Sequence, residues 1–336
     1  METRKVQTVG NGTYTVSLPK EWAESHDLAA GEIVTVHEHL DGVLALQSGD
    51  QSNGELPATA DVDTGDSAVL ERALRAAYAS GVREVTIHHD GSLTAAHRDV
   101  VERVTRERVG MSVTAESGAA TTVQILLDST EVSVSQSLRQ LSFAVCSIHR
   151  DAVRAFAAPP AASSIDSRHD QVDRLSAMVE RSVARGMADL GEVDALGTTR
   201  SELFESWTAM RALGRVHDAA MSITDAAASL EDAPADARLD PCHEIGDDAC
   251  EAVSDGVDVV LGDADVTGAQ CIIADLRRIR DRLDDFDRAL DDATNDVSAL
   301  RRVSRELRRT AASGTDIAEV GLRRAVRRGD SICDRA

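Results

Sequence analysis

The sequence predicts a multi-domain, mainly α-helical protein with a small β-rich N-terminal segment, a middle α+β unit and two tandem three-helix bundles. Three observations predict this organisation. Near the N-terminus, apolar and polar residues alternate with a period of two, which is typical of a half-buried strand. A stretch rich in Gly, Ser, Asp and Pro follows at residues 48–66. From residue 130 onward, apolar residues recur every three or four positions, as in amphipathic helices.

The first segment, residues 1–47, reads as a strand, a short helix and a hairpin. Tyr14, Val16 and Leu18 alternate with small polar residues, and Pro19 ends this strand and opens a helix. Two further strands flank the turn signal Asp-Gly at residues 41–42. Because so short a segment buries little surface, we expect it to need a partner chain.

Residues 48–66 are predicted to be a linker, and residues 67–128 a small unit with the order α-β-α-β-β. The two consecutive histidines of this unit, His88 and His89, raise the question of a metal site. Neighbouring strand residues point to opposite faces of a sheet, so a structural role is the preferred interpretation.

The remaining chain is predicted to form one three-helix bundle at residues 129–232 and another at residues 233–330. The six expected helices cover about 130–153, 165–190, 201–230, 239–261, 266–292 and 295–329. The third and sixth helices share a pattern in which an arginine is followed eight residues later by an isoleucine. Arg215 and Ile223 align with Arg309 and Ile317 at a constant offset, 309 − 215 = 94. This pattern, together with the matching helix count, indicates a duplicated bundle.

The composition is strongly acidic, with a formal net charge of −22, and lysine occurs only at positions 5 and 20. This balance is typical of proteins that stay soluble in molar salt, so we expect an extreme halophile. At molar salt the Debye length is about 3 Å, so the net charge says little about partners. The five cysteines form no C-x-x-C pair, and the sequence contains neither a signal peptide nor a membrane-spanning run. We therefore expect a cytoplasmic protein with reduced thiols and no membrane insertion.

Residues 4–46, RKVQTVGNGTYTVSLPKEWAESHDLAAGEIVTVHEHLDGVLAL, resemble the AbrB/SpoVT/MazE swapped-hairpin DNA-binding domain. The resemblance rests on the SLPKEW corner, the L-x-x-G-E step and the final Asp-Gly hairpin. It implies that two chains interlace through their N-terminal hairpins into one β-barrel, each contributing half. It also implies promoter DNA as a partner. The residues that we expect to contact DNA are Arg4, Lys5, Asn11, Tyr14 and Lys20.

Residues of about 130–330 resemble PhoU, a phosphate-signalling regulator built of two three-helix bundles. The resemblance rests on LRRTAASGTDIAEVGLRRAV near the C-terminus and GRVHDAAMSITD in the third helix. The fusion with an AbrB-type head is similar to PhoU-like regulators of halophilic archaea. The resemblance implies control of phosphate uptake, with a phosphate-transporter ATPase or a signalling kinase as further partners.

PhoU proteins are associated with an acidic motif that holds clustered metal ions, and this sequence departs from it. Asp218 stands at the second acid of the motif, but Gly214 occupies the first. In the second repeat, Arg308 and Ala312 occupy the two positions. The resemblance therefore implies a metal cluster only where the first bundle keeps acids.

Four carboxylates of the first bundle are the candidates for a divalent or iron-type metal ion: Asp170, Asp173, Asp218 and Asp225. The first two lie three residues apart on the second helix, and the last two lie seven apart on the third helix, so each pair shares a face. If both faces look inward, the four side chains converge on one ion. The alternative is a solvated acidic face, and it is the preferred one. A ligand-like cluster at Cys242, His243, Asp247 and Cys250 lacks a second cysteine pair, so a structural role is preferred there too.

The last 37 residues reverse the charge, with ten arginines against five acids. Five of the arginines recur along one side of the sixth helix: Arg301, Arg302, Arg305, Arg308 and Arg309. They fit either an acidic partner or phosphate, or else the aspartates of the preceding helix, and the intramolecular pairing is the preferred interpretation. These aspartates are Asp284, Asp285, Asp287, Asp291 and Asp292.

The sequence contains no P-loop, G-x-S-x-G, H-E-x-x-H or kinase motif, so we expect no enzymatic activity. Three hypotheses are open, and the least favoured is a carboxylate-bundle metalloprotein with enzymatic activity, because its acidic motif is broken. In the first, the protein is a homodimeric, DNA-binding transcriptional regulator of phosphate-dependent genes. In the second, it is an adaptor that negatively regulates a phosphate transporter or a signalling kinase without binding DNA, and the N-terminal domain serves only to dimerise it.

Overall fold

The computed structural model describes residues 3–10, 12–40, 42–48, 59–63, 65–155, 162–228, 236–262, 265–291 and 297–329, with the backbone alone at 162–167 and 236–239. The chain forms two compact units, Met1–Glu55 and Leu56–Ala336. None of the helices within the described residues is long and apolar enough to span a membrane.

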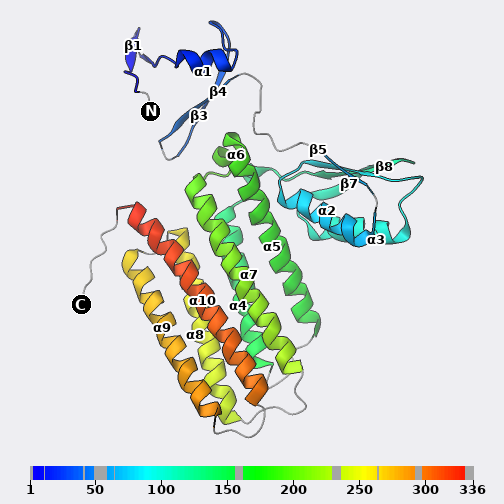
Figure 1. Cartoon of the computed structure of the whole chain (residues 1–336), viewed down its shortest axis with the longest axis vertical. Coiled ribbons are helices and arrows are strands. Elements are labelled where there is room, and N and C mark those ends of the chain that lie inside the picture. Colours follow the sequence, from blue (N-terminus) through cyan, green and yellow to red (C-terminus); the bar gives the residue numbers. More distant parts are fainter. Residues whose placement is uncertain are drawn as a thin grey trace. The chain divides into compact units, whose positions relative to one another are not determined.

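The N-terminal unit consists of two small hairpins and one short helix (Figure 1). Strand β1 (Gln7–Val9) pairs antiparallel with β2 (Thr13–Thr15), and β3 (Val34–Glu38) pairs antiparallel with β4 (Leu44–Ser48). Helix α1 (Lys20–Ser25) lies between them in the chain and starts after Pro19, as predicted. The opening strand is a hairpin rather than the single strand expected, because Gly10 and Gly12 take positive φ angles of 67° and 131° and reverse the chain.

The described part of this unit contains no buried side chain. Its apolar residues are exposed instead, among them Tyr14 at 74%, Ile33 at 83% and Leu44 at 62%. A hydrophobic core has not formed within one copy, which agrees with the expectation that the segment needs a partner chain.

The second unit begins with a four-stranded sheet in the order β5-β6-β8-β7. Its elements are β5 (Thr59–Asp63), α2 (Ser67–Ala79), β6 (Glu84–His88), α3 (Ala95–Glu107), β7 (Met111–Glu116) and β8 (Ala120–Ile125). Strand β5 pairs parallel with β6, so the order is β-α-β-α-β-β and the linker prediction is wrong at residues 59–63. Only Ala60 and Val62 of β5 pack against the core, and they alternate with Asp61 and Asp63 in a strand of five residues, which is too short a pattern to predict a strand.

Six long helices make up the rest of the described chain, within a few residues of their predicted positions (Figure 1). They are α4 (Val134–Arg154), α5 (Ala162–Ala188), α7 (Arg200–Ala228), α8 (Asp236–Leu261), α9 (Val266–Leu290) and α10 (Val297–Arg327). The predicted break after the second helix contains a short helix, α6 (Leu190–Ala195), and a 3₁₀ turn, η1 (Ser129–Glu131), precedes α4.

The six long helices share one hydrophobic core. Helix α4 packs on α8, and α7 packs on α10, so the predicted boundary near residue 232 does not separate two cores. Small residues allow this close approach. A Cβ atom at Gly246 would lie 3.2 Å from Val153, and one at Gly256 would lie 3.2 Å from Ile317.

Candidate functional site

The residues expected to contact DNA lie on the surface of the N-terminal unit. Arg4, Lys5, Tyr14 and Lys20 are all exposed, and Asn11 lies outside the described residues. Lys20 forms a surface ion pair with Glu24, with Nζ 3.4 Å from Oε1. Such an exposed pair contributes little stability, so the ammonium group of Lys20 remains accessible to a phosphate. The hairpin β1-β2 carries Tyr14 close to these cations in the sequence.

The four carboxylates proposed as metal ligands do not face the bundle interior. Asp170 and Asp173 on α5, and Asp218 and Asp225 on α7, are all exposed. Among the described residues, no group of three or more His, Cys, Asp or Glu side chains is placed to hold a metal ion. The residues present therefore do not fit the metal cluster that the PhoU resemblance implies, and the solvated acidic face describes them.

Two histidines beside these acids make a contact that the sequence pattern did not reveal. His169 Nδ1 on α5 lies 3.1 Å from His217 Nε2 on α7. Burial lowers the pKa of His217, and the neighbouring His169 lowers it further, against the negative charges of Asp218 and Asp173. The contact joins α5 to α7, and the lowered pKa of His217 favours the neutral form of that imidazole.

The Cys242–Cys250 segment takes part in a buried polar cluster rather than in a tetrahedral site. Cys250 Sγ lies 3.2 Å from His149 Nδ1 and donates to the carbonyl of Cys146, whose own thiol donates to the carbonyl of Cys250. This reciprocal contact sets α4 against α8. His149 had no signal in the sequence, since its partners come from helices about a hundred residues away.

His88 and His89 of the α+β unit point to opposite sides of the sheet, as predicted. His88 is half-exposed and pairs with Asp61, with Nε2 3.0 Å from Oδ1. His89 is buried, and its Nε2 lies 3.1 Å from Thr121 Oγ1. Both histidines thus have structural partners.

Two of the five arginines in the basic stripe of α10, Arg301 and Arg308, pair with aspartates of the preceding helix, as the preferred interpretation has it. Arg308 bridges Asp284 and Asp287 of α9 at 2.5 and 2.8 Å, and Arg301 contacts Asp291 at 2.5 Å. Arg305 and Arg309 both contact Glu306, whose side chain is buried. Asp292 lies outside the described residues.

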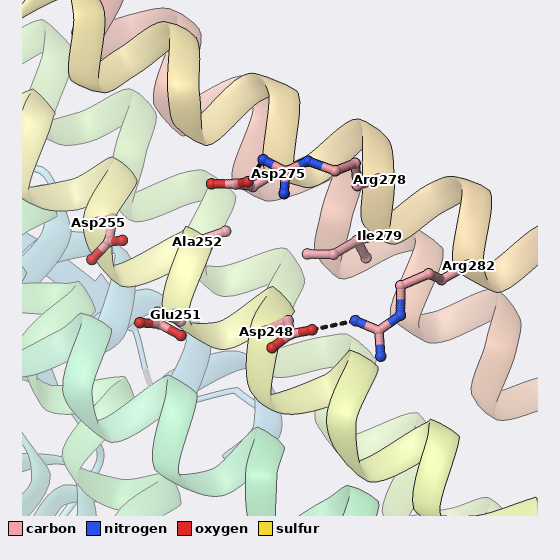
Figure 2. Close-up of a pocket in the computed structure, with 8 residues that line it drawn as sticks. All are labelled: Asp248, Glu251, Ala252, Asp255, Asp275, Arg278, Ile279 and Arg282. Atoms are coloured by element: carbon pink, nitrogen blue, oxygen red, sulfur yellow. Dashed lines mark hydrogen bonds and ion pairs between the residues drawn. The ribbon is translucent and has the colours of Figure 1, made fainter.

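A groove of about 390 Å³ runs between α8 and α9 (Figure 2). Arg282 reaches Asp248, and Arg278 reaches Asp275. Burial raises the pKa of Asp255, and the negative charges of Glu251, Asp258 and Asp275 raise it further. The groove is therefore a negatively charged surface, partly neutralised by two arginines, and it contains no assembled metal site among the described residues.

Comparison with known proteins identifies the N-terminal unit. Residues 7–52 match the family described as "Antidote-toxin recognition MazE, bacterial antitoxin". This match shows a MazE/AbrB-type N-terminal domain, as the SLPKEW corner predicted. No curated protein and no solved structure matches the chain.

Proposed function

We propose that the protein is a DNA-binding transcriptional regulator whose MazE/AbrB-type domain binds promoter DNA as a homodimer. The observation that carries this proposal is the match of residues 7–52 to the MazE family. The absence of any buried side chain in the described part of that unit supports dimerisation, because one copy alone has no core. Arg4, Lys5 and Lys20 supply charges for phosphates, and Tyr14 supplies a neutral donor.

We further propose that the helical bundle is the sensor part of this regulator and that it responds to phosphate status. The support is the resemblance of GRVHDAAMSITD and LRRTAASGTDIAEVGLRRAV to PhoU, together with the six long helices that pack around one core. The alternative, an adaptor that does not bind DNA, is favoured by the acidic residues of the N-terminal unit, which outnumber its three basic residues.

A mobility-shift assay separates these two functions. The full chain is mixed with a pool of promoter fragments, and Lys5→Ala/Lys20→Ala is compared with the unchanged chain. We expect the double variant to lose about tenfold or more in affinity, because it lacks two contacts to phosphates. Each lost contact also lowers the salt dependence of binding by about one counterion. Arg72→Ala, on an exposed part of α2, is the matched control and should bind as the unchanged chain does. Failure of the unchanged chain to retain any fragment would falsify the regulator and favour the adaptor.

A further inference from the structure

Two buried arginines on α5 join the helical bundle to the α+β unit. Arg181 is only 1% exposed, and Arg185 is only 8% exposed. Arg181 Nη1 donates to the carbonyl oxygens of Tyr78 and Val82, both at 2.9 Å, and Arg185 Nη1 donates to that of Gly81 at 3.2 Å. The two guanidinium groups therefore bind the carbonyls at the C-terminal end of α2, where the helix dipole favours positive charge.

The positive charge at this contact is incompletely neutralised. Within the described residues, Arg181 Nε and Nη2 and Arg185 Nε are buried without a hydrogen-bond partner. Burial lowers the pKa of Arg181 to about 10, with further lowering by the charges of Arg185 and Arg83. Burial and Arg83 also lower the pKa of Arg185, against the charge of Asp189. Buried cations with unused donors are costly, and they favour binding of an anion.

A cleft of about 470 Å³ is lined by one of these arginines, Arg185, and by Arg83. The apolar residues 125–127, at the end of β8 and just after it, also line this cleft. The volume falls within the range of about 300–1,000 Å³ that is usual for small-molecule sites, which often lie between packed units of a chain. The lining thus combines guanidinium donors with an apolar surface.

One carboxylate already occupies the polar part of this cleft. Glu192, on the short helix α6, accepts hydrogen bonds from Arg185 Nη2, from Ser129 Oγ and from Arg83 Nη2, the last at 3.3 Å. The Glu192 side chain is only 11% exposed, whereas that of Arg83 is 63% exposed. A single carboxylate thus serves two guanidinium groups that together offer many more donors.

Two further acids line the cleft and limit the charge of a ligand. Asp128 is engaged locally, because its Oδ1 accepts hydrogen bonds from the amide and the hydroxyl of Thr130. Glu131 is exposed. With these carboxylates at the cleft, a ligand with a single anionic group fits better than one that carries several.

We propose that this cleft binds a small ligand through one oxyanion group, a carboxylate or a phosphate, which replaces the Glu192 carboxylate on Arg83 and Arg185. The apolar part of the ligand packs against residues 125–127. Release of Glu192 frees α6, which connects α5 to α7, so occupation of the cleft is transmitted to the helical bundle. This site is independent of DNA binding by the N-terminal unit.

Calorimetric titration of the full chain at fixed ionic strength tests the proposal with two probes, inorganic phosphate and isovalerate. Glu192→Gln keeps the shape of the side chain and removes its charge, so we expect about tenfold tighter binding of the anion. Arg83→Ala removes an exposed donor without disturbing the core, and we expect about tenfold weaker binding. Glu131→Gln removes a carboxylate that lines the same cleft but does not contact the two arginines in the structure, so it is the matched control.

Binding of phosphate alone supports the proposal with a phosphate-bearing ligand, and binding of isovalerate alone supports it with a carboxylate. The proposal is overturned if neither probe binds the unchanged chain or Glu192→Gln. It is also overturned if Glu131→Gln tightens binding as much as Glu192→Gln, because the effect is then one of general charge. Melting curves without probe check that each variant is folded.

Discussion

At the scale of single residues, one fully buried titratable group is His149, which contacts side chains of α8 and α10 from its place on α4. Its Nε2 lies 2.9 Å from Thr310 Oγ1, and the Thr310 hydroxyl in turn donates to the carbonyl of Glu306. This direction of donation assigns the proton of the imidazole to Nε2 and leaves Nδ1 unprotonated, 3.2 Å from Cys250 Sγ. His149 is therefore buried in its neutral form.

Burial lowers the pKa of His149 from 6.5 to about 4, with a smaller contribution from Arg150. As the pH falls below 6.5, the unfolded chain binds a proton at this residue while the folded chain does not. Stability is thus lost between pH 6.5 and 4, by roughly 3 kcal/mol for this group. Urea unfolding at pH 7 and pH 4.5 measures the loss, and the loss should shrink by about 2 kcal/mol in His149→Gln. An unchanged pH dependence in that variant would contradict a neutral buried imidazole.

The sequence predicted the character of surface residues better than it predicted buried polar sites. Lys20 could be placed on the surface because it belongs to the local SLPKEW corner. His149, Arg181 and Glu192 could not, because their partners lie 161, 103 and 109 residues away in the chain. The aspartates of α5 and α7 share helical faces as predicted, but helical spacing does not say whether a face looks inward.

At the scale of elements, helices were predicted more securely than strands. The long apolar period of α10 fixes its buried face over 31 residues. Strand β5 has only five residues, two of them aspartates, and its pairing with β6 depends on a chain segment more than twenty residues away. Sheet pairing of this kind overrides local propensity.

The glycines of the bundle distinguish close helix packing from open surface. A Cβ atom at Gly321 on α10 would lie 2.5 Å from Val259 Cγ1 and 3.2 Å from the Val259 backbone carbon on α8. The added methyl group would force the backbones of α8 and α10 apart at this point. We therefore expect Gly321→Ala to lower the free energy of unfolding by about 1–3 kcal/mol. Gly214→Ala on α7 is the matched control, since its Cβ would meet nothing within 4 Å. It should stabilise the protein by about 0.5–1 kcal/mol. Chemical denaturation measures both changes, and equal effects would contradict close packing at Gly321.

At the scale of the whole molecule, the two compact units differ in how complete each is as a single copy. The unit Leu56–Ala336 has two hydrophobic cores, one under the α+β sheet and one shared by the six long helices. The unit Met1–Glu55 has no buried side chain among its described residues. The division into a small N-terminal unit and a helical remainder was foreseeable from periodicity. The shared core of the six long helices was not, since it depends on contacts between α4 and α8 and between α7 and α10.

The exposed apolar residues of the N-terminal unit predict that the full chain is a homodimer held together there. Leu44 on β4 is 62% exposed and Val36 on β3 is 53% exposed in one copy. Burying a side chain such as Leu is worth about 1.5–3 kcal/mol, and a buried aspartate in its place costs several more. We therefore expect Leu44→Asp to convert the dimer to a monomer, as measured by light scattering after size exclusion at micromolar concentration. Val69→Asp makes a similar change at a 52% exposed position on α2 and should leave the dimer intact. A monomeric unchanged chain would contradict the homodimer, and dissociation by both variants alike would place the contact between copies elsewhere than in the hairpins.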